Sequence, residues 1–166
     1  MQNLTLLAAI GKNNELGVDN HLIWRIKEDL AFYKKMTLDH YLIMGRKTLV
    51  SLPAGALEGW RRPIVLSKRP LDRYCDLSCF NDLSSLLEFV SLVPEEFIVI
   101  GGSQIYKLLL PYVETMYLTE IQQEYPEADS YFPEFDKSDW TSEVLGDYRK
   151  EGADPPYVRK KYIRHR

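Results

Sequence analysis

The sequence predicts an α/β fold in a single domain, residues 1–166, with three layers: a mostly parallel central sheet, helices on both of its faces, and an antiparallel C-terminal strand. Short apolar runs alternate with helical patterns along most of the chain. These runs are apolar on nearly every residue, as in strands that are buried on both faces. A length of 166 residues with 45% hydrophobic residues suits one core, and no repeat, low-complexity tract or Gly/Ser linker marks a boundary.

The elements follow in order. Strands are expected at 4–10 (LTLLAAI), 40–44 (HYLIM), 63–67 (PIVLS), 96–100 (EFIVI) and 115–121 (TMYLTEI), and helices from about Ile26, shortly after Arg46, across 82–93 and over 103–111. After residue 121 the helical patterns stop. The stretches 142–150 and 157–166 predict a closing pair of strands.

The segment Trp24–Thr37 predicts an amphipathic helix, because Ile26, Leu30, Tyr33, Met36 and Thr37 recur at spacings of three and four residues. Asp29 projects inside this apolar arc. A carboxylate there is either an acid that interacts with the helix dipole or a functional group.

Composition excludes several classes of protein. No window reaches the 18 apolar residues of a membrane span, and residues 1–14 lack a signal-peptide pattern, so we expect a soluble, cytoplasmic protein. The thiols of Cys75 and Cys79 have no partners at zinc spacing, so no metal site is expected. With a net charge of −3, the chain as a whole does not attract a polyanion, so we expect no binding of nucleic acid. The basic 159–166 stretch is interpreted as a solvated terminal strand.

Two strand-to-helix junctions carry glycine. Gly45 precedes Arg46, Lys47 and Thr48, and Gly101–Gly102 precede a helix from about Ser103. Glycine lets backbone N–H groups approach a phosphate, although it also serves simply to turn the chain. Two such junctions favour a ligand with two phosphate positions, such as a dinucleotide, yet neither G-x-G-x-x-G nor a P-loop is present.

The sequence resembles dihydrofolate reductase, and of the bacterial type. Leu16-Gly17, Trp24, Asp29, Tyr33 and Thr37 match the spacing of the family's N-terminal signature. The segments IMGRKT, PIVLSKRP, VIGGSQIY, YLTEI and ADSYFPEF resemble family segments in the same order.

The resemblance implies reduction of 7,8-dihydrofolate by NADPH, with hydride transfer to pterin C6 and protonation at N5, in a monomeric enzyme that supports one-carbon metabolism. It implies that Asp29 anchors the pterin, that Thr119 hydrogen-bonds this carboxylate, and that Trp24 holds a water near it. The alternative roles are a strand residue for Thr119 and core packing for Trp24.

The remaining implied site residues fall into two sets. Substrate contacts are expected from Leu7, Ala9, Leu30, Tyr33, Ser51, Leu52, Leu57, Arg61 and Ile100. Cofactor contacts are expected from Ala9, Leu16, Gly45, Arg46, Lys47, Thr48, Leu66, Ser67, Lys68, Ile100, Gly101, Gly102, Ser103, Gln104, Ile105 and Tyr106. Arg61 would bind the substrate's α-carboxylate, with Arg62 in reserve, and Arg46, Lys47 and Lys68 would converge on the 2′-phosphate of NADPH.

The polar, glycine-containing stretch 11–23 lacks structure signals and is expected to form a lid over the site. Three residues depart from the family pattern. Ile23 and Lys27 stand where proline is usual or common, and Arg159 stands where an aromatic residue is common, for which the sequence offers no physical reason.

Two other functions are alternatives. One is the NADPH-dependent pyrimidine reductase of riboflavin synthesis, which shares the fold but lacks the Trp-x4-Asp helix. The other is a noncatalytic nucleotide- or RNA-binding module that uses the basic tail, against which the acidic balance of the chain argues.

Overall fold

The structure is a computed structural model that describes residues 3–53, 55–69, 78–153 and 155–165. Its helices and strands, in chain order, are β1 (Leu4–Ile10), β2 (Glu15–Val18), β3 (His21–Leu22), α1 (Lys27–Thr37), β4 (His40–Gly45), α2 (Arg46–Ser51), β5 (Arg61–Leu66), β6 (Ser78–Phe80), α3 (Leu83–Leu92), β7 (Phe97–Gly101), α4 (Ser103–Leu109), η2 (Leu110–Tyr112), β8 (Thr115–Ile121), β9 (Ser130–Tyr131), η3 (Lys137–Asp139), β10 (Trp140–Val144) and β11 (Tyr157–Arg164).

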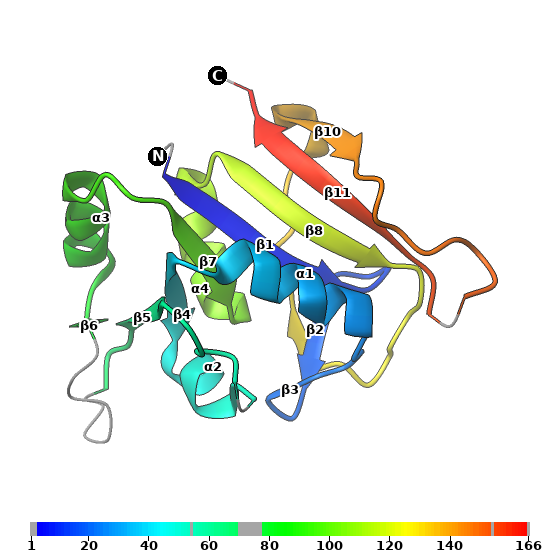
Figure 1. The fold of residues 1–166 in the computed structure, drawn as a ribbon, viewed down its shortest axis with the longest axis horizontal. Coiled ribbons are helices and arrows are strands. Elements are labelled where there is room, and N and C mark those ends of the chain that lie inside the picture. The colour runs from blue at the N-terminus through cyan, green and yellow to red at the C-terminus, as the bar shows by residue number, and fades with distance from the viewer. Residues whose placement is uncertain (1–2, 54, 70–77, 154, 166) are drawn as a thin grey trace.

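In the described part of the chain the central sheet has eight strands in the order β10-β11-β8-β1-β7-β4-β5-β6 (Figure 1). From β8 to β6 every pairing is parallel, whereas β11 runs antiparallel to both β8 and β10. The predicted fold class is therefore confirmed. The parallel strands end together at one edge of the sheet, which is where α/β folds place their ligands.

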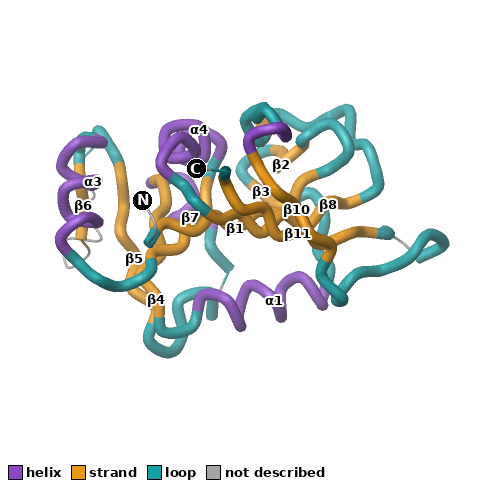
Figure 2. Tube along the Cα trace, turned by 90° about the horizontal axis from the view of Figure 1, so that it is seen from above, coloured by secondary structure: helices purple, strands orange, loops and turns teal. Residues whose placement is uncertain are grey.

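Two apolar clusters lie on opposite faces of the sheet. One contains the buried residues of α3 and α4, and the other contains Phe32 of α1 and Leu49 of α2. Successive residues of β1 alternate between them, since Leu6 and Ala8 join the first cluster and Leu7 joins the second. Figure 2 shows α1 and α4 on opposite sides of the strands, as the three-layer prediction requires.

The stretch 11–23, expected to be a lid loop because it lacks structure signals, contains two strands, and its role as a lid stays a prediction. β2 and β3 form a hairpin, and β2 also pairs with β9 in a second, small sheet. The turn between them is Asp19-Asn20, with φ of 48° and 62°. Positive φ at both residues of a two-residue turn is the conformation that matches the twist of a hairpin. The Asp-Asn pair was the signal for this hairpin.

Two other strand predictions differ from the structure. The first closing strand was expected at 142–150 but lies at Trp140–Val144, and only an isolated bridge joins Arg149 to Tyr157 beyond it. The short strand β6 was not expected. Cys79 is an exposed free thiol, whereas Cys75 lies outside the described residues.

The described residues contain no helix that is long and apolar enough to cross a membrane. They also contain no group of three or more His, Cys, Asp and Glu side chains placed to hold a metal ion.

Candidate active site

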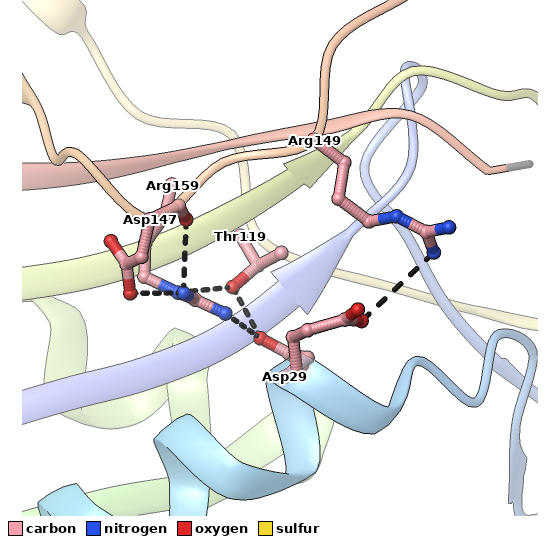
Figure 3. A network of polar contacts seen from close by, with 6 residues as sticks. Asp29, Thr119, Asp147, Arg149 and Arg159 are labelled. Carbon is pink, nitrogen blue, oxygen red and sulfur yellow. Dashed lines mark hydrogen bonds and ion pairs between the residues drawn. The ribbon is translucent and has the colours of Figure 1, made fainter. Parts of the chain in front are cut away.

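The carboxylate of Asp29 lies in the first turn of α1 and faces β8. Ile26, just before the helix, is buried against Ile121 and Tyr157, which fixes where the helix starts. The hydroxyl of Thr119 donates a hydrogen bond of 2.6 Å to Oδ1 of Asp29 (Figure 3). The contact predicted between these two residues is therefore present.

Arg159 completes this cluster from the neighbouring strand. It pairs with Thr119 across the sheet, and its Nη2 donates to the same Oδ1 of Asp29 at 2.7 Å. Its Nε donates to the Thr119 hydroxyl at 3.2 Å, and its Nη1 contacts both the backbone oxygen and the side chain of Asp147. Asp29 thus has a cation as its neighbour, not the purely apolar flanks that the helix pattern indicated.

Arg159 also corrects the interpretation of the basic C-terminal stretch. Its side chain is only 1% exposed, so the stretch is not simply a solvated strand. Lys160 pairs with Glu120 at 3.2 Å, and the Arg164 guanidinium lies 4.2 Å from the ring centroid of Trp140. Most of this positive charge is therefore used inside the protein.

Trp24 lies behind the start of α1 and packs with Ile26 and Ala9. Its indole N–H donates to the side-chain oxygen of Gln123 at 3.1 Å, and its ring lies edge-on to Tyr125. The predicted role of Trp24 in holding a water near Asp29 stays a prediction.

Arg61 lies beside the other end of α1. Its Nε donates to the Thr37 hydroxyl at 2.9 Å, its Nη2 to the backbone oxygen of Lys34 at 2.7 Å, and its Nη1 to that of Glu58. Each terminal nitrogen keeps a further N–H group for a ligand. Arg62 instead lies with its guanidinium 5.6 Å from the Trp60 ring centroid, so the geometry favours Arg61 over Arg62.

The predicted substrate wall comes together between α1, α2 and the sheet. One apolar cluster contains Leu7, Tyr33, Leu52, Leu57 and Ile100. Leu30 is 42% exposed, and Ser51 is exposed and donates to the backbone oxygen of Thr48. Ala9 is half-buried on β1.

The glycine junctions lie side by side, because Gly45 is in register with Leu66, and Met44 with Gly101. Gly101 has a φ of 113°, and a Cβ added there would lie 3.0 Å from the Tyr106 ring. A Cβ at Gly45 would lie 3.0 Å from Ile105. The backbone at these junctions therefore lies close to α4, and a larger residue would force the two apart.

The other predicted cofactor residues border this edge. Thr48, Ser103 and Gln104 lie in the first turns of α2 and α4, and Ser67 and Lys68 follow β5 directly. Arg46 and Lys47 open α2, so the three cations Arg46, Lys47 and Lys68 follow adjacent strands. Asn20, in the β2–β3 turn, donates to the backbone oxygen of Lys47 at 3.4 Å, which brings the hairpin to the same edge.

Tyr106 connects this edge to the substrate wall. Its hydroxyl is buried and donates to the backbone oxygen of Leu7 at 2.7 Å. Burial raises the pKa of Tyr106, and the nearby Tyr33 and Asp29 raise it further, so the hydroxyl is a permanent donor. Leu16 packs against the cluster that contains Tyr106.

Comparison with known proteins identifies the family. The family model described as "Dihydrofolate reductase" matches residues 3–164. The chain belongs to the dihydrofolate reductase family. It is 39% identical over 137 residues to the dihydrofolate reductase of Bacillus subtilis, which covers 82% of this chain and 79% of the relative. It is 38% identical to that of Neisseria gonorrhoeae, over 98% of this chain and 99% of the relative.

The fold agrees with the family. A dihydrofolate reductase from Enterococcus faecalis, solved as a complex with NADP(H) and RAB-propyl, superposes with a TM-score of 0.84 at 24% identity, over 98% of this chain and 96% of that one. As a family member, the chain is an NADPH-dependent oxidoreductase that reduces dihydrofolate. The match over nearly the whole chain sets aside the riboflavin-pathway reductase and the noncatalytic module.

Sequence reasoning missed three residues of the Asp29 cluster in this dihydrofolate reductase fold. Arg159 was noted only as a departure from the family pattern, and neither Phe32 nor Asp147 was singled out. The Arg159 guanidinium lies 4.0 Å from the ring centroid of Phe32. A signal existed for Arg159, because a charged residue in an otherwise apolar family position requires a partner once the strand is buried.

Proposed function

We propose that Asp29 is the group through which this enzyme anchors the pterin ring of 7,8-dihydrofolate. The observation that carries the proposal is the hydrogen bond of 2.6 Å between Thr119 and Oδ1 of Asp29. Both described partners of the carboxylate, Thr119 and Arg159, bind Oδ1, and among the described residues none donates to Oδ2. The carboxylate is therefore oriented and keeps an acceptor for the pterin N3–H and 2-amino groups.

Asp29 also acts on the proton of the reaction. Reduction adds a hydride at C6 and a proton at N5, and the anionic charge of Asp29 near the ring favours that proton. The family resemblance supports water as the direct donor, with Asp29 as the electrostatic partner. Trp24, close to the start of α1, would hold that water near the carboxylate.

Arg61 would bind the α-carboxylate at the far end of the substrate. Its guanidinium is fixed by the hydroxyl of Thr37 and by two backbone oxygens, all of them neutral. The N–H groups that remain on its terminal nitrogens suit a two-point contact with a carboxylate. Leu30, Tyr33, Leu52 and Leu57 would surround the rings between the two ends.

The residues at the junctions of β4, β5 and β7 fit NADPH. Gly45, Gly101 and Gly102 allow its pyrophosphate to approach the backbone, while Arg46, Lys47 and Lys68 supply positive charge for the 2′-phosphate. When bound, NADPH supplies the hydride. Ala9, Ile100 and Tyr106 border the point where the two ligands would meet.

A steady-state assay tests the assignment. The purified chain, mixed with NADPH and dihydrofolate, should lower the absorbance of NADPH, with the loss dependent on dihydrofolate. The Asp29→Asn enzyme should lose this turnover yet bind NADPH as the wild type does. Normal turnover in Asp29→Asn would remove the carboxylate from the mechanism.

Cofactor preference tests the three cations. Replacing Arg46 and Lys47 together by glutamine should weaken NADPH about tenfold or more, the scale for lost charge-assisted contacts, and leave NADH nearly unchanged. The double substitution of Lys34 and Lys35 by glutamine, exposed on α1, is the matched control. Equal weakening of both cofactors would contradict a 2′-phosphate site here.

We infer that the enzyme acts as a monomer in the cytoplasm and binds no nucleic acid. One chain supplies every residue of the proposed site, the exposed thiol of Cys79 suits a reducing compartment, and several basic residues of β11 are engaged internally. Light scattering during size exclusion tests the oligomeric state, and a stable dimer would contradict it.

A further inference from the structure

Arg159 is a buried cation at the substrate end of the sheet. Its side chain is 1% exposed, and its guanidinium lies 4.0 Å from the centroid of Phe32 and 5.4 Å from that of Tyr157. Stacking on aromatic rings favours a desolvated guanidinium. Aromatic stacking does not offset the hydration that the buried guanidinium has lost, so the stability of the folded state depends on the carboxylates that contact Arg159.

Two carboxylates contact this cation from opposite sides. Asp29 binds Nη2 at 2.7 Å from α1, and Asp147 binds Nη1 from the segment between β10 and β11. The Asp29 side chain is 26% exposed and that of Asp147 is 49% exposed, so both carboxylates retain some water. Arg159 is the only one of the three that is nearly fully enclosed. Figure 3 shows its guanidinium between the two.

The hydrogen bonds to Asp29 all reach one of its two carboxylate oxygens. Arg159 and Thr119 both donate to Oδ1, and the Arg159 Nε also donates to the Thr119 hydroxyl, which leaves the hydroxyl proton for Asp29. These three bonds close a ring on one oxygen. The ring selects one orientation of the carboxylate, with Oδ1 against the sheet and Oδ2 away from it.

We infer that Arg159 is a positioning residue for Asp29, which turns Oδ1 into the sheet, leaves Oδ2 for the pterin and supplies the carboxylate's counter-charge. This inference rests on the proposed role of Asp29. Asp147 has a second effect: its negative charge offsets part of the positive charge of Arg159, so the electrostatic field at Asp29 depends on Asp147 as well.

Arg159 also affects the pH dependence of the reaction. A cation fixed beside the site opposes the uptake of a proton by the bound pterin, so it lowers the pH up to which the protonated, reactive complex persists. Among the described residues, the other charged and titratable groups that line the cavity beside Arg159 are Glu28, Lys35, Asp147, Tyr148, Arg149 and Tyr157, and Tyr106 lies near Asp29. None of them is a histidine, and Arg149 is already paired with Glu28 at 4.0 Å.

Two substitutions of Arg159 test its role. In Arg159→Met, the decline of the hydride-transfer rate at high pH should shift to higher pH by about one unit. The KM for dihydrofolate should rise about tenfold. NADPH affinity should stay unchanged. Arg159→Lys restores the charge and should restore the pH profile, though not the full affinity, because lysine lacks the fork that reaches two partners. Hydride transfer is measured in single turnovers from pH 5 to about 10.

Arg164→Met is the matched control. Arg164 lies on the same strand, stacks on Trp140 and donates to the backbone oxygens of Val113 and Leu110, but it does not contact Asp29. Its loss should leave the pH profile and the KM for dihydrofolate unchanged. A wild-type profile and KM in Arg159→Met, or equal changes in Arg164→Met, would overturn the inference.

Asp147→Asn keeps the test decisive if Arg159→Met does not fold. Asp147 is half exposed, and the substitution removes an anion that competes for Arg159. The positive charge of Arg159 then acts more strongly at Asp29 and the pterin. The decline of the hydride-transfer rate at high pH should therefore shift to lower pH, opposite to the shift in Arg159→Met. No shift, or an upward shift, would overturn the inference.

Asp29→Asn separates this inference from the proposed function. If Asp29→Asn retains wild-type turnover, the proposed role of Asp29 fails. If Asp29→Asn loses turnover while Arg159→Met and Asp147→Asn keep the wild-type profile, only the role of Arg159 fails.

Discussion

Oppositely charged side chains lie at the two ends of α1, Asp29 at the N-terminal end and Arg61 beside the C-terminal end, and they have different kinds of partner. At the N-terminal end the carboxylate of Asp29 contacts the buried guanidinium of Arg159. Beside the C-terminal end the guanidinium of Arg61 contacts only neutral oxygens, and among the described residues no carboxylate forms an ion pair with it. The charge of Asp29 is therefore balanced within the protein, whereas the charge of Arg61 has no counter-ion among the described residues.

This difference assigns different tasks to the two ends. In the proposed function the chemistry of the pterin takes place beside Asp29, so this carboxylate needs a fixed orientation and a controlled charge. At Arg61 the substrate's own carboxylate can supply the counter-charge, so the interaction contributes affinity and depends on salt. Substitutions at the first end should alter turnover and its pH dependence, whereas substitutions at the second should alter KM.

Asp29→Asn is expected to give the largest effect. Turnover near neutral pH should fall by roughly 10² or more, the scale for losing a positioned acid–base group, and should recover relative to wild type as the pH falls and solvent protonates N5. The free energy of unfolding should also fall, by roughly 2 kcal/mol, because Arg159 loses a counter-ion. NADPH titration and urea unfolding separate the two losses. Wild-type turnover across pH would return Asp29 to the helix-dipole interpretation.

Arg61→Met comes next. The KM for dihydrofolate should rise about tenfold or more with kcat nearly unchanged, since a charge-assisted contact is lost far from the reacting atoms. The salt dependence of KM should weaken as well. Arg62→Met, which removes the neighbouring guanidinium over Trp60, is the control and should behave as wild type. The reverse result would make Arg62 the substrate residue.

Two isosteric threonine substitutions, one beside each end of α1, test the same difference. Thr119→Val removes the hydroxyl that binds Asp29, and Thr37→Val removes the one that accepts from Arg61. Each substitution removes a hydrogen bond that contributes about 1 kcal/mol, which corresponds to a change of roughly fivefold in the affected kinetic constant. The loss should appear in hydride transfer for Thr119→Val and in KM for Thr37→Val. Steady-state and single-turnover kinetics of both variants distinguish these patterns, and identical patterns would erase the difference between the ends.

Tyrosine titration offers the smallest effect. Burial raises the pKa of both Tyr33 and Tyr106, but Arg61 partly lowers that of Tyr33, whereas Asp29 adds to the rise at Tyr106. A raised tyrosine pKa stabilises the fold below the unfolded value of 10.0, and this stability is lost as the pH rises above it. Arg61→Met should raise the pKa of Tyr33 further. Phenolate absorbance, compared with Tyr33→Phe, measures it, and a fall would contradict the electrostatic contact.

Much of the fold could be predicted because each main strand and helix carries a local signal. The run LTLLAAI, the Asp82 cap that accepts from Ser85, and the spacing of Ile26 with its successors all report their own structure. The β2–β3 hairpin is short and polar, so apolar periodicity could not reveal it. The Asp-Asn turn was its only local mark.

The site was less predictable, because its central contact joins residues far apart in the chain. Asp29 and Arg159 are 130 positions apart and meet only because β11 lies beside β8 and α1 packs across their ends. Nothing in the helix pattern of α1 specifies a cation from the last strand. Arg61 was selected by counting back from the expected strand at 63–67, and it is the first residue of β5. Its contact with the substrate stays a prediction.

A substrate without a tail tests the difference between the two ends most directly. A 7,8-dihydropterin that lacks the benzoylglutamate group keeps the contacts expected at Asp29 and removes those expected at Arg61. With this substrate kcat/KM should be the same in wild type and Arg61→Met, whereas Asp29→Asn should lose as large a factor as it does with dihydrofolate. If Arg61→Met reduced kcat/KM for the tailless pterin as much as for dihydrofolate, or if Asp29→Asn reduced only the latter, the assignment of the two ends would be contradicted.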